Sequence, residues 1–352
     1  MKKSVRMLLV TCAGLLGLAF AGPALAAYEP SLTVEQSNYK VGGSPTVDFF
    51  IFSDPDNDPT AKLTIFSPSG YSSNISQAPG TTIGNAVAFV KAGALGGSIL
   101  PLAGPVVVGD PSSASIKAAA QQCTGSAATQ AVWVLDTQLQ GQKVTVPDFV
   151  NKVGPYLVQQ ICLPAPKDAA FQAQLVSADF NVRGVFTSAS SRGAYQWALD
   201  GTPYLPGTGT VNPTGTSEWR TYVGLPSSLT LKLGKNKAGK RTLTGKLSIA
   251  GLNPAGVRLY VYGSKKARPA PNATSAGTGK VVGRTKPLKS TGKYTFRIKV
   301  RRTTFFQTRF ENYGLLGSCQ GPSPSGLPIP CKGTDLAPLT SNQLRVKPIR
   351  RR

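Results

Sequence analysis

Apolar and polar residues alternate along short segments of this chain, and glycine, proline, asparagine and serine separate the segments. The alternation is cleanest in Lys293–Arg301, where Tyr, Phe, Ile and Val occupy every second position between Lys, Thr and Arg. Successive side chains of a strand point to opposite faces, so this spacing predicts a strand with one apolar and one basic face. The same reasoning predicts strands near residues 31–35, 46–52, 61–66, 131–135, 143–146, 157–163, 174–185, 195–199, 229–233, 241–249, 257–262, 280–284, 293–301, 304–310 and 343–347.

Two other segments break this pattern. Residues 114–122 are alanine-rich and lie between Pro111 and Gly125, which predicts one short helix. Residues 92–109 carry no charge, but five glycines and two prolines favour short strands and turns there over a continuous helix. The fold class expected is therefore all-β, with two β-sandwich (immunoglobulin-like) domains and at most one short helix in the N-terminal domain.

The first 26 residues read as a cleavable signal peptide. Lys2, Lys3 and Arg6 precede an uncharged, mostly apolar run, and Ala24-Leu25-Ala26 supplies a small-x-small cleavage pattern. A transmembrane anchor is the alternative, but a span needs roughly 20 apolar residues, and this run is shorter. We therefore expect an extracytoplasmic protein, secreted or associated with the cell envelope.

Cysteine usage agrees with export. Cys123, Cys162, Cys319 and Cys331 follow the expected cleavage site, and an even number in an exported protein predicts disulfides. Three pairings are possible, and we expect the neighbours to pair, Cys123 with Cys162 and Cys319 with Cys331. Zinc is not expected, because the chain has no histidine and no C-x-x-C spacing.

Charge divides the chain unevenly. Residues 28–226 hold 10 Lys and Arg against 13 Asp and Glu, whereas residues 227–352 hold 26 against 2. We therefore expect an N-terminal β-rich domain at 27–226 and a basic sandwich domain at 227–352, each with its own disulfide.

The basic domain is the strongest functional lead. Strand alternation places a set of Lys and Arg residues outward, and its positive field should attract polyanions. The expected polyanion-binding residues are Lys232, Lys246, Arg258, Tyr260, Lys293, Arg297, Lys299, Arg301, Arg309, Arg345 and Lys347, with Tyr262 sharing the outward parity of Arg258 and Tyr260.

The partners expected for this surface are anionic cell-wall or extracellular polymers, with anionic lipid headgroups of a membrane surface as another candidate. An exported protein meets these before it meets nucleic acid, so nucleic acid is the less favoured partner. A solvated surface with no partner is the alternative. Neither a cofactor nor an oligomeric state is indicated by the sequence.

Catalytic and metal motifs are weak. Asp54-Pro55-Asp56-Asn57-Asp58 is acidic, but Pro59 and Ile65 occupy the places where an EF-hand needs Gly and Glu, so an acidic turn is favoured. Without histidine, Ser-His-Asp and Cys-His catalysis are excluded. A glycosidase needs only two carboxylates, for which Asp136, Asp148, Asp179, Asp200 and Glu218 are available. We expect a non-catalytic protein, with a carbohydrate-active enzyme, a carbohydrate-binding module or a structural spacer as alternatives.

Several runs resemble known sequences. The run that begins DPTAKLTIFSPSGYSS at Asp58 and the run VSADFNVRGVFTSASSRGAYQWALDG at Val176 resemble a set of secreted, largely uncharacterised proteins of actinobacteria. The segments LTGKLSIAGLNPAGVRLYVYG and GKYTFRIKVRRTTFFQTRF resemble immunoglobulin-like repeat domains of exported bacterial proteins. The resemblance implies a β-sandwich fold for the C-terminal part.

Overall fold

The computed structural model describes residues 28–236, 240–251, 253–267, 277–287, 289–311, 319 and 321–349. The predicted signal peptide at 1–26 lies outside the described residues, as do Arg268 and residue 320 of the Cys319–Cys331 loop. Most of the described chain is β-strand with one α-helix, which confirms the all-β expectation. Within these residues no helix is both long enough and apolar enough to cross a membrane.

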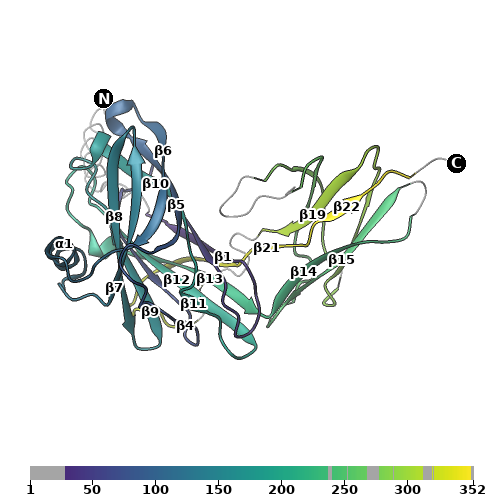
Figure 1. The fold of residues 1–352 in the computed structure, drawn as a ribbon, viewed down its shortest axis with the longest axis horizontal. Coiled ribbons are helices and arrows are strands. Elements are labelled where there is room, and N and C mark those ends of the chain that lie inside the picture. The colour runs from purple at the N-terminus through teal and green to yellow at the C-terminus, as the bar shows by residue number, and fades with distance from the viewer. Residues whose placement is uncertain are drawn as a thin grey trace, which may run out of the picture.

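The N-terminal part is one twelve-stranded sheet that nearly closes on itself (Figure 1). The edge strand β1 lies against β13 and β20 at the other end of the order, and the Thr33 hydroxyl donates to Asp335 Oδ2 across this seam (3.4 Å). The strand order is β1 (Ser31–Gln36), β2 (Val47–Phe52), β10 (Ala173–Val182), β5 (Thr82–Ala92), β6 (Ser98–Val108), β7 (Ala131–Leu139), β8 (Gln142–Val153), β9 (Tyr156–Cys162), β3 (Thr60–Phe66), β12 (Gly193–Pro203), β13 (Ser217–Leu225) and β20 (Cys331–Leu336). The expected N-terminal sandwich is therefore wrong, because these strands form one continuous ladder instead of two sheets.

Inward-facing residues of this sheet form the larger core. Phe49, Phe180, Phe186 and Trp197 pack together at its centre with ring centroids 5.0 to 6.3 Å apart, and β4 (Ser72–Ser73) pairs with β11 (Phe186–Thr187) beside them. Edge-to-face packing of buried aromatic rings adds to the free energy of their burial.

The predicted helix is confirmed as α1 (Ala114–Thr124). It begins where the Ser113 hydroxyl accepts a hydrogen bond from the Ile116 amide, and it ends at Gly125 in the left-handed conformation (φ 78°). Ala120 packs on Val132 and Phe149, on the outer side of β7 and β8.

Residues 92–109 form a long strand instead of short strands and turns. After a single 3₁₀ turn (Gly93–Leu95), β6 runs unbroken through two prolines, Pro101 and Pro105, and pairs along its length with β5. The prolines are tolerated because the ladder on the other side, with β7, is incomplete. Gly104 is needed there, since a Cβ would lie 1.8 Å from the Asp136 carbonyl oxygen.

The C-terminal part contains two smaller sheets around a second core. One is β14 (Ser227–Leu233), β15 (Arg241–Ile249) and β18 (Lys293–Ile298), and the other is β17 (Lys280–Thr285), β16 (Leu259–Ser264), β19 (Thr304–Phe310), β21 (Leu339–Thr340) and β22 (Leu344–Val346). We call them together the C-terminal sheet pair. Their apolar faces meet at Leu231, Leu243, Val261, Phe306 and Phe310, all at most 1% exposed.

The chain does not divide cleanly at residue 226. Within the range expected to be the basic domain, β20 crosses back to the N-terminal part and pairs in parallel with β13. The twelve-stranded sheet thus includes residues 331–336, and Leu336 and Ala337 lie in different cores although they are adjacent in sequence.

Candidate functional site

Lysine and arginine side chains cover the outer face of β14, β15 and β18. Lys232, Lys246, Lys293 and Arg297 are exposed, as predicted from the alternation. Lys246 and Lys293 stand directly opposite each other in the ladder, and neither has an ion pair among the described residues. Like charges in this arrangement are destabilising, so this pair does not stabilise the sheet.

A shallow depression of about 490 Å³ lies at the β18 edge of this face, beside the turn that leads from β17 of the other sheet into β18. Three exposed lysines line it, Lys286, Lys289 and Lys293, with three threonines between them, Thr285, Thr291 and Thr295. Ammonium groups and hydroxyls are donors suited to phosphate or carboxylate oxygens. We call this site the lysine depression. Lys286 and Lys289 were not among the residues predicted from strand parity, because they lie in the turn between β17 and β18.

Basic residues also lie on the outside of the second sheet. Arg258, Arg345 and Lys347 are exposed, and Tyr260 is partly exposed. The Arg284 guanidinium lies over the Tyr260 ring, 5.3 Å from its centroid, a favourable cation–π contact. Lys299 and Arg301, in the segment that follows β18, are exposed as well.

Arg309 is the exception among the predicted residues, because it is buried. Alternation along β19 places its side chain on the outer face of the sheet, but the N-terminal part covers it there. Arg309 Nη1 and Nη2 donate to the two Glu35 carboxylate oxygens at 2.9 and 3.0 Å. Its Nε donates to Glu311 Oε1 at 3.0 Å. Arg309 therefore joins the two parts of the molecule and is not available to a polyanion.

Tyr262 also departs from the prediction. It is 8% exposed, and its hydroxyl donates to Glu311 Oε1 at 3.2 Å. The register with β17 shifts between Val261 and Tyr262, so the outward stripe ends at Tyr260.

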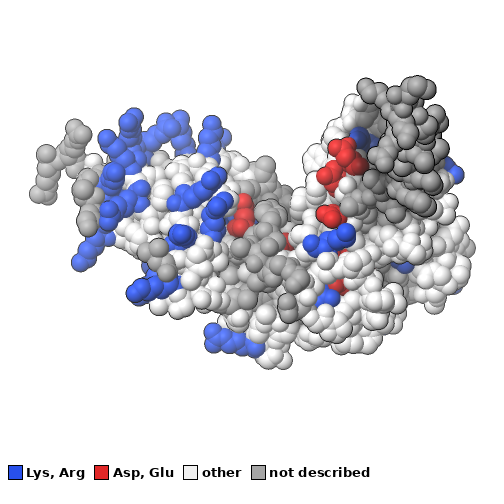
Figure 2. Space-filling view, turned by 180° about the vertical axis from the view of Figure 1, so that it is seen from behind, with Lys and Arg blue, Asp and Glu red and all other residues white. Residues whose placement is uncertain are grey.

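The chain's own acids leave the rest of the basic surface unneutralised. Figure 2 shows Lys and Arg crowded over the C-terminal sheet pair, whereas acidic side chains lie mostly on the other part. Of the two acids beyond residue 226, Glu311 is engaged by Arg309, and Asp335 is buried in β20 within the twelve-stranded sheet.

Two of the candidate catalytic carboxylates, Asp200 and Glu218, do come together. They are directly opposite on β12 and β13. Burial, and then the negative charge of Glu218, raise the pKa of Asp200 to about 8. Arg220 Nε donates to Glu218 Oε1, and the Ser323 hydroxyl donates to Glu218 Oε2.

This carboxylate pair is closed off from solvent. Asp200 is 6% exposed, Glu218 is fully buried, and residues 321–325 of the disulfide loop lie over them. A glycosidase needs a cleft in which a sugar chain and a water reach both carboxylates. In this fold the two carboxylates are instead part of a buried polar network with Arg220 and Ser323.

The remaining candidate carboxylates are scattered. Asp136 forms an exposed ion pair with Lys143 (3.1 Å), and Asp148 is fully buried inside the large sheet, where burial raises its pKa well above the usual range. Asp179 lies near Asp48 on the outer face of β10, and burial followed by the charge of Asp48 raises the pKa of Asp179 to about 7.

Both predicted disulfides are confirmed. Cys123–Cys162 ties the end of α1 to the end of β9, and Cys319–Cys331 closes the loop above Glu218. Two disulfides fit an oxidising environment outside the cytoplasm.

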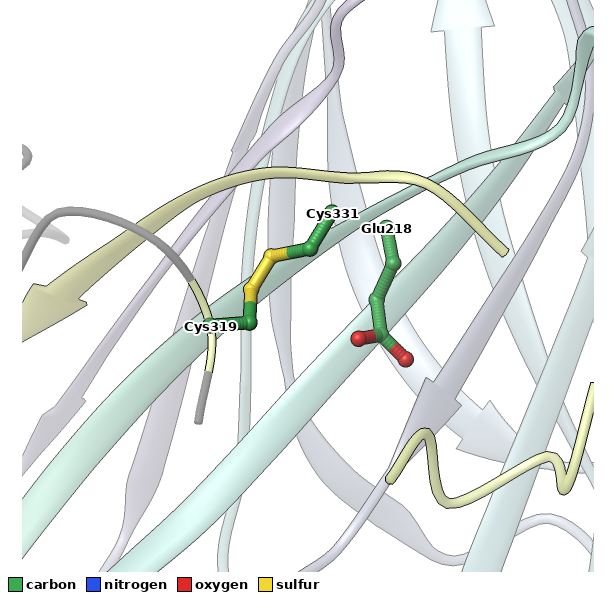
Figure 3. A group of neighbouring side chains, drawn as sticks. All are labelled: Glu218, Cys319 and Cys331. Atoms are coloured by element: carbon green, nitrogen blue, oxygen red, sulfur yellow. A yellow bond between two sulfur atoms is a disulfide. The ribbon is translucent and has the colours of Figure 1, made fainter. Parts of the chain in front are cut away.

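Metal-type ligands gather at one place among the described residues, where Glu218, Cys319 and Cys331 lie close together (Figure 3). The two sulfurs are bonded to each other, so they are not thiolate ligands. The 54–58 run forms the expected acidic turn, in which Asp54 Oδ1 accepts the Asp56 amide and Asp56 pairs with Lys91.

Comparisons with known proteins provide no identity for this arrangement: no family model matches the chain, and a search of curated proteins returns no match.

Proposed function

We propose that this chain is a secreted or cell-envelope protein whose C-terminal sheet pair, an immunoglobulin-like sandwich, binds anionic surface polymers electrostatically. The observation that carries the proposal is the lysine depression, where three lysines and three threonines line one hollow. The Thr285 hydroxyl donates to the Thr295 carbonyl at 3.0 Å, so the donors toward an anion are the three lysines with Thr291 and Thr295. The lysine depression continues into Lys246, opposite Lys293, so the positive charge extends across the neighbouring strands.

The chemistry favours a polymer of repeating phosphate or carboxylate groups. Each Lys or Arg that engages a phosphate releases counterions, so the affinity should fall steeply with salt concentration. Several weak contacts along one polymer chain then add up. A single small anion makes only a few contacts in the open depression and is easily displaced by water. Teichoic acids and acidic polysaccharides have this repeating charge.

The test uses the chain from residue 27 onward, because β20 in an isolated C-terminal part would lack its partner strand β13. Retention on immobilised polyphosphate and on purified cell wall is measured across a salt gradient. K286Q/K289Q/K293Q should elute at clearly lower salt than the unmodified chain, with a smaller dependence of log affinity on log salt concentration, by about 1 per lost phosphate contact.

A matched control removes three exposed lysines from the other part, K40Q/K117Q/K152Q, with the same change in net charge. This variant should elute close to the unmodified chain. Equal shifts for both triple variants would mean that only net charge matters, and retention that ignores salt would contradict electrostatic binding. If cell-wall localisation of K286Q/K289Q/K293Q is unchanged, the spacer alternative is favoured.

A further inference from the structure

A second site lies inside the twelve-stranded sheet. A cavity of about 140 Å³ is enclosed by β2, β3, β5 to β10 and the segment that follows β9. Of its 25 lining residues only Thr60, Thr137 and Gln174 have polar side chains. Each has a partner within the protein: Ser53 for Thr60, the Val144 carbonyl for Thr137 and the Asn57 carbonyl for Gln174.

The cavity therefore presents hydrocarbon and offers water few hydrogen bonds. An apolar cavity of about 150 Å³ in another protein stays dry and binds benzene, so this one has room for roughly six carbon atoms. The size excludes a whole lipid but accommodates one end of an alkyl chain.

The cavity exists because small residues stand where large ones would fill it. On β5 and β10 the inward positions Ala88 and Ala178 face each other in the ladder, and Ala86 faces Phe180. The cavity separates the main core from a small cluster of Val90, Leu102 and Leu139. Unfilled core volume is destabilising, so a fold that keeps it can recover that loss by binding a ligand.

Pro164 and Ala170, two lining residues between β9 and β10, are exposed, so the cavity reaches the surface at this end of the sheet. The connecting segment lines it with Pro164, Pro166, Ala169 and Ala170. It ends at Phe171 and Gln172, two non-glycine residues with left-handed backbone (φ 56° and 52°). Such conformations are unfavourable and concentrate at ligand-binding sites.

Charged side chains of both signs stand at this end of the sheet. Lys91 follows the lining residue Val90 on β5 but pairs with Asp56 at 3.2 Å. Lys167 and Asp168 are exposed between the lining residues Pro166 and Ala169, and Lys167 has no ion pair among the described residues. An apolar interior with the Lys167 ammonium group near the opening matches a molecule with a hydrocarbon tail and an anionic head.

We propose that this cavity binds the end of an acyl chain, with the anionic head of the fatty acid or lipid left at the opening beside Lys167. The site is independent of the lysine depression, which lies on the other part of the molecule.

The test is a titration calorimetry series with saturated fatty-acid anions of four to twelve carbons and with 1-alkanols of the same lengths. Affinity should rise about fourfold per methylene until roughly six carbons are inside, and then flatten. The alkanols should follow the same length dependence with weaker binding, and K167Q should reduce the difference between the two series.

A88L should weaken binding at least tenfold, because the leucine occupies the cavity, and it should fold with an equal or higher melting temperature. A103L adds the same side chain on the exposed outer side of β6 and should bind like the unmodified chain. If A88L does not fold, the smaller A178V replaces it.

K286Q/K289Q/K293Q should bind acyl chains normally, which separates this site from attraction of the anions to the basic surface. The proposal fails if A88L and A103L bind equally well, or if affinity does not depend on chain length. It also fails if benzene and cyclohexane bind while acyl chains do not, since the site would then serve free small hydrocarbons.

Discussion

Arg309 shows how one residue can satisfy a sequence rule and still have another role. Alternation along β19 predicts an outward side chain, yet the Arg309 guanidinium contacts Glu35 and Glu311. The side chains are 8% exposed for Arg309, 10% for Glu35 and 23% for Glu311. A bidentate pair in this setting connects the two parts of the molecule.

R309A should therefore destabilise the protein by about 3–5 kcal/mol, because it removes the bidentate guanidinium that neutralises the buried Glu35 carboxylate. Urea unfolding measures the loss. R345A, an exposed arginine on the neighbouring strand β22, is the control and should change stability little. If R309A lowered retention on polyphosphate and left the unfolding midpoint unchanged, the buried assignment would be wrong.

Asp335 is a buried carboxyl whose protonation should make stability depend on pH. Burial raises the pKa of Asp335 to about 8, although hydroxyls such as Thr221 and Thr33 act in the opposite direction. The unfolded carboxyl titrates near 4. Between roughly pH 4 and pH 8 the folded state holds a proton that the unfolded state has released, so the contribution of Asp335 to stability falls as pH rises.

D335N should remove this dependence. The excess of its free energy of unfolding over that of the unmodified chain should grow between pH 5 and pH 9 by at least roughly 1 kcal/mol. Urea unfolding at pH 5, 7 and 9 measures the difference, with D54N as the control for loss of an exposed carboxylate. Parallel pH profiles for D335N and the unmodified chain would contradict the prediction.

At the level of elements, local patterns located most strands and the helix, but not their partners. β15, β18 and β19 were predicted within a few residues, because alternation and turn residues are local signals. β20 was missed because its sequence, Cys331–Leu336, contains Gly and Asp and no apolar alternation. Its extended form comes from pairing with β13, which no local pattern encodes.

A chain ending at Pro226 should therefore lose stability although it contains the entire expected N-terminal domain. Without β20, the β13 edge is exposed, and an unpaired edge strand invites association. All three tryptophans, Trp133, Trp197 and Trp219, lie in the twelve-stranded sheet, so fluorescence-detected unfolding follows this sheet alone.

The shortened chain should unfold at lower urea concentration than the chain that starts at residue 27 and continues to residue 352, and it should form oligomers in light scattering. A monomeric shortened chain with an unchanged unfolding midpoint would show that β20 adds nothing to the sheet.

At the scale of the whole molecule, the two parts differ in charge and in the kind of site they carry. The C-terminal sheet pair has a basic exterior, and the N-terminal sheet has an apolar interior with space in it. They touch through Arg309, Glu35 and Tyr39, whose hydroxyl donates to the Pro338 carbonyl at 2.7 Å. The N-terminal acids therefore neutralise one of the predicted basic residues and leave the remainder exposed.

The sequence alone determined the β class, the helix and the outward direction of most basic residues, and it favoured, among three possible pairings, the neighbouring cysteine pairs that the structure contains. Each of these depends on residues close together in the chain or on the period of a strand. Tertiary structure decided that the first part is one nearly closed sheet, that β20 completes it and that Arg309 is covered. It also produced the cavity, because Ala88 and Ala178 face each other only when strands far apart in sequence become neighbours. Pairing between strands that are far apart in sequence depends on how well the faces of many strands pack together. No single segment of the sequence contains that information.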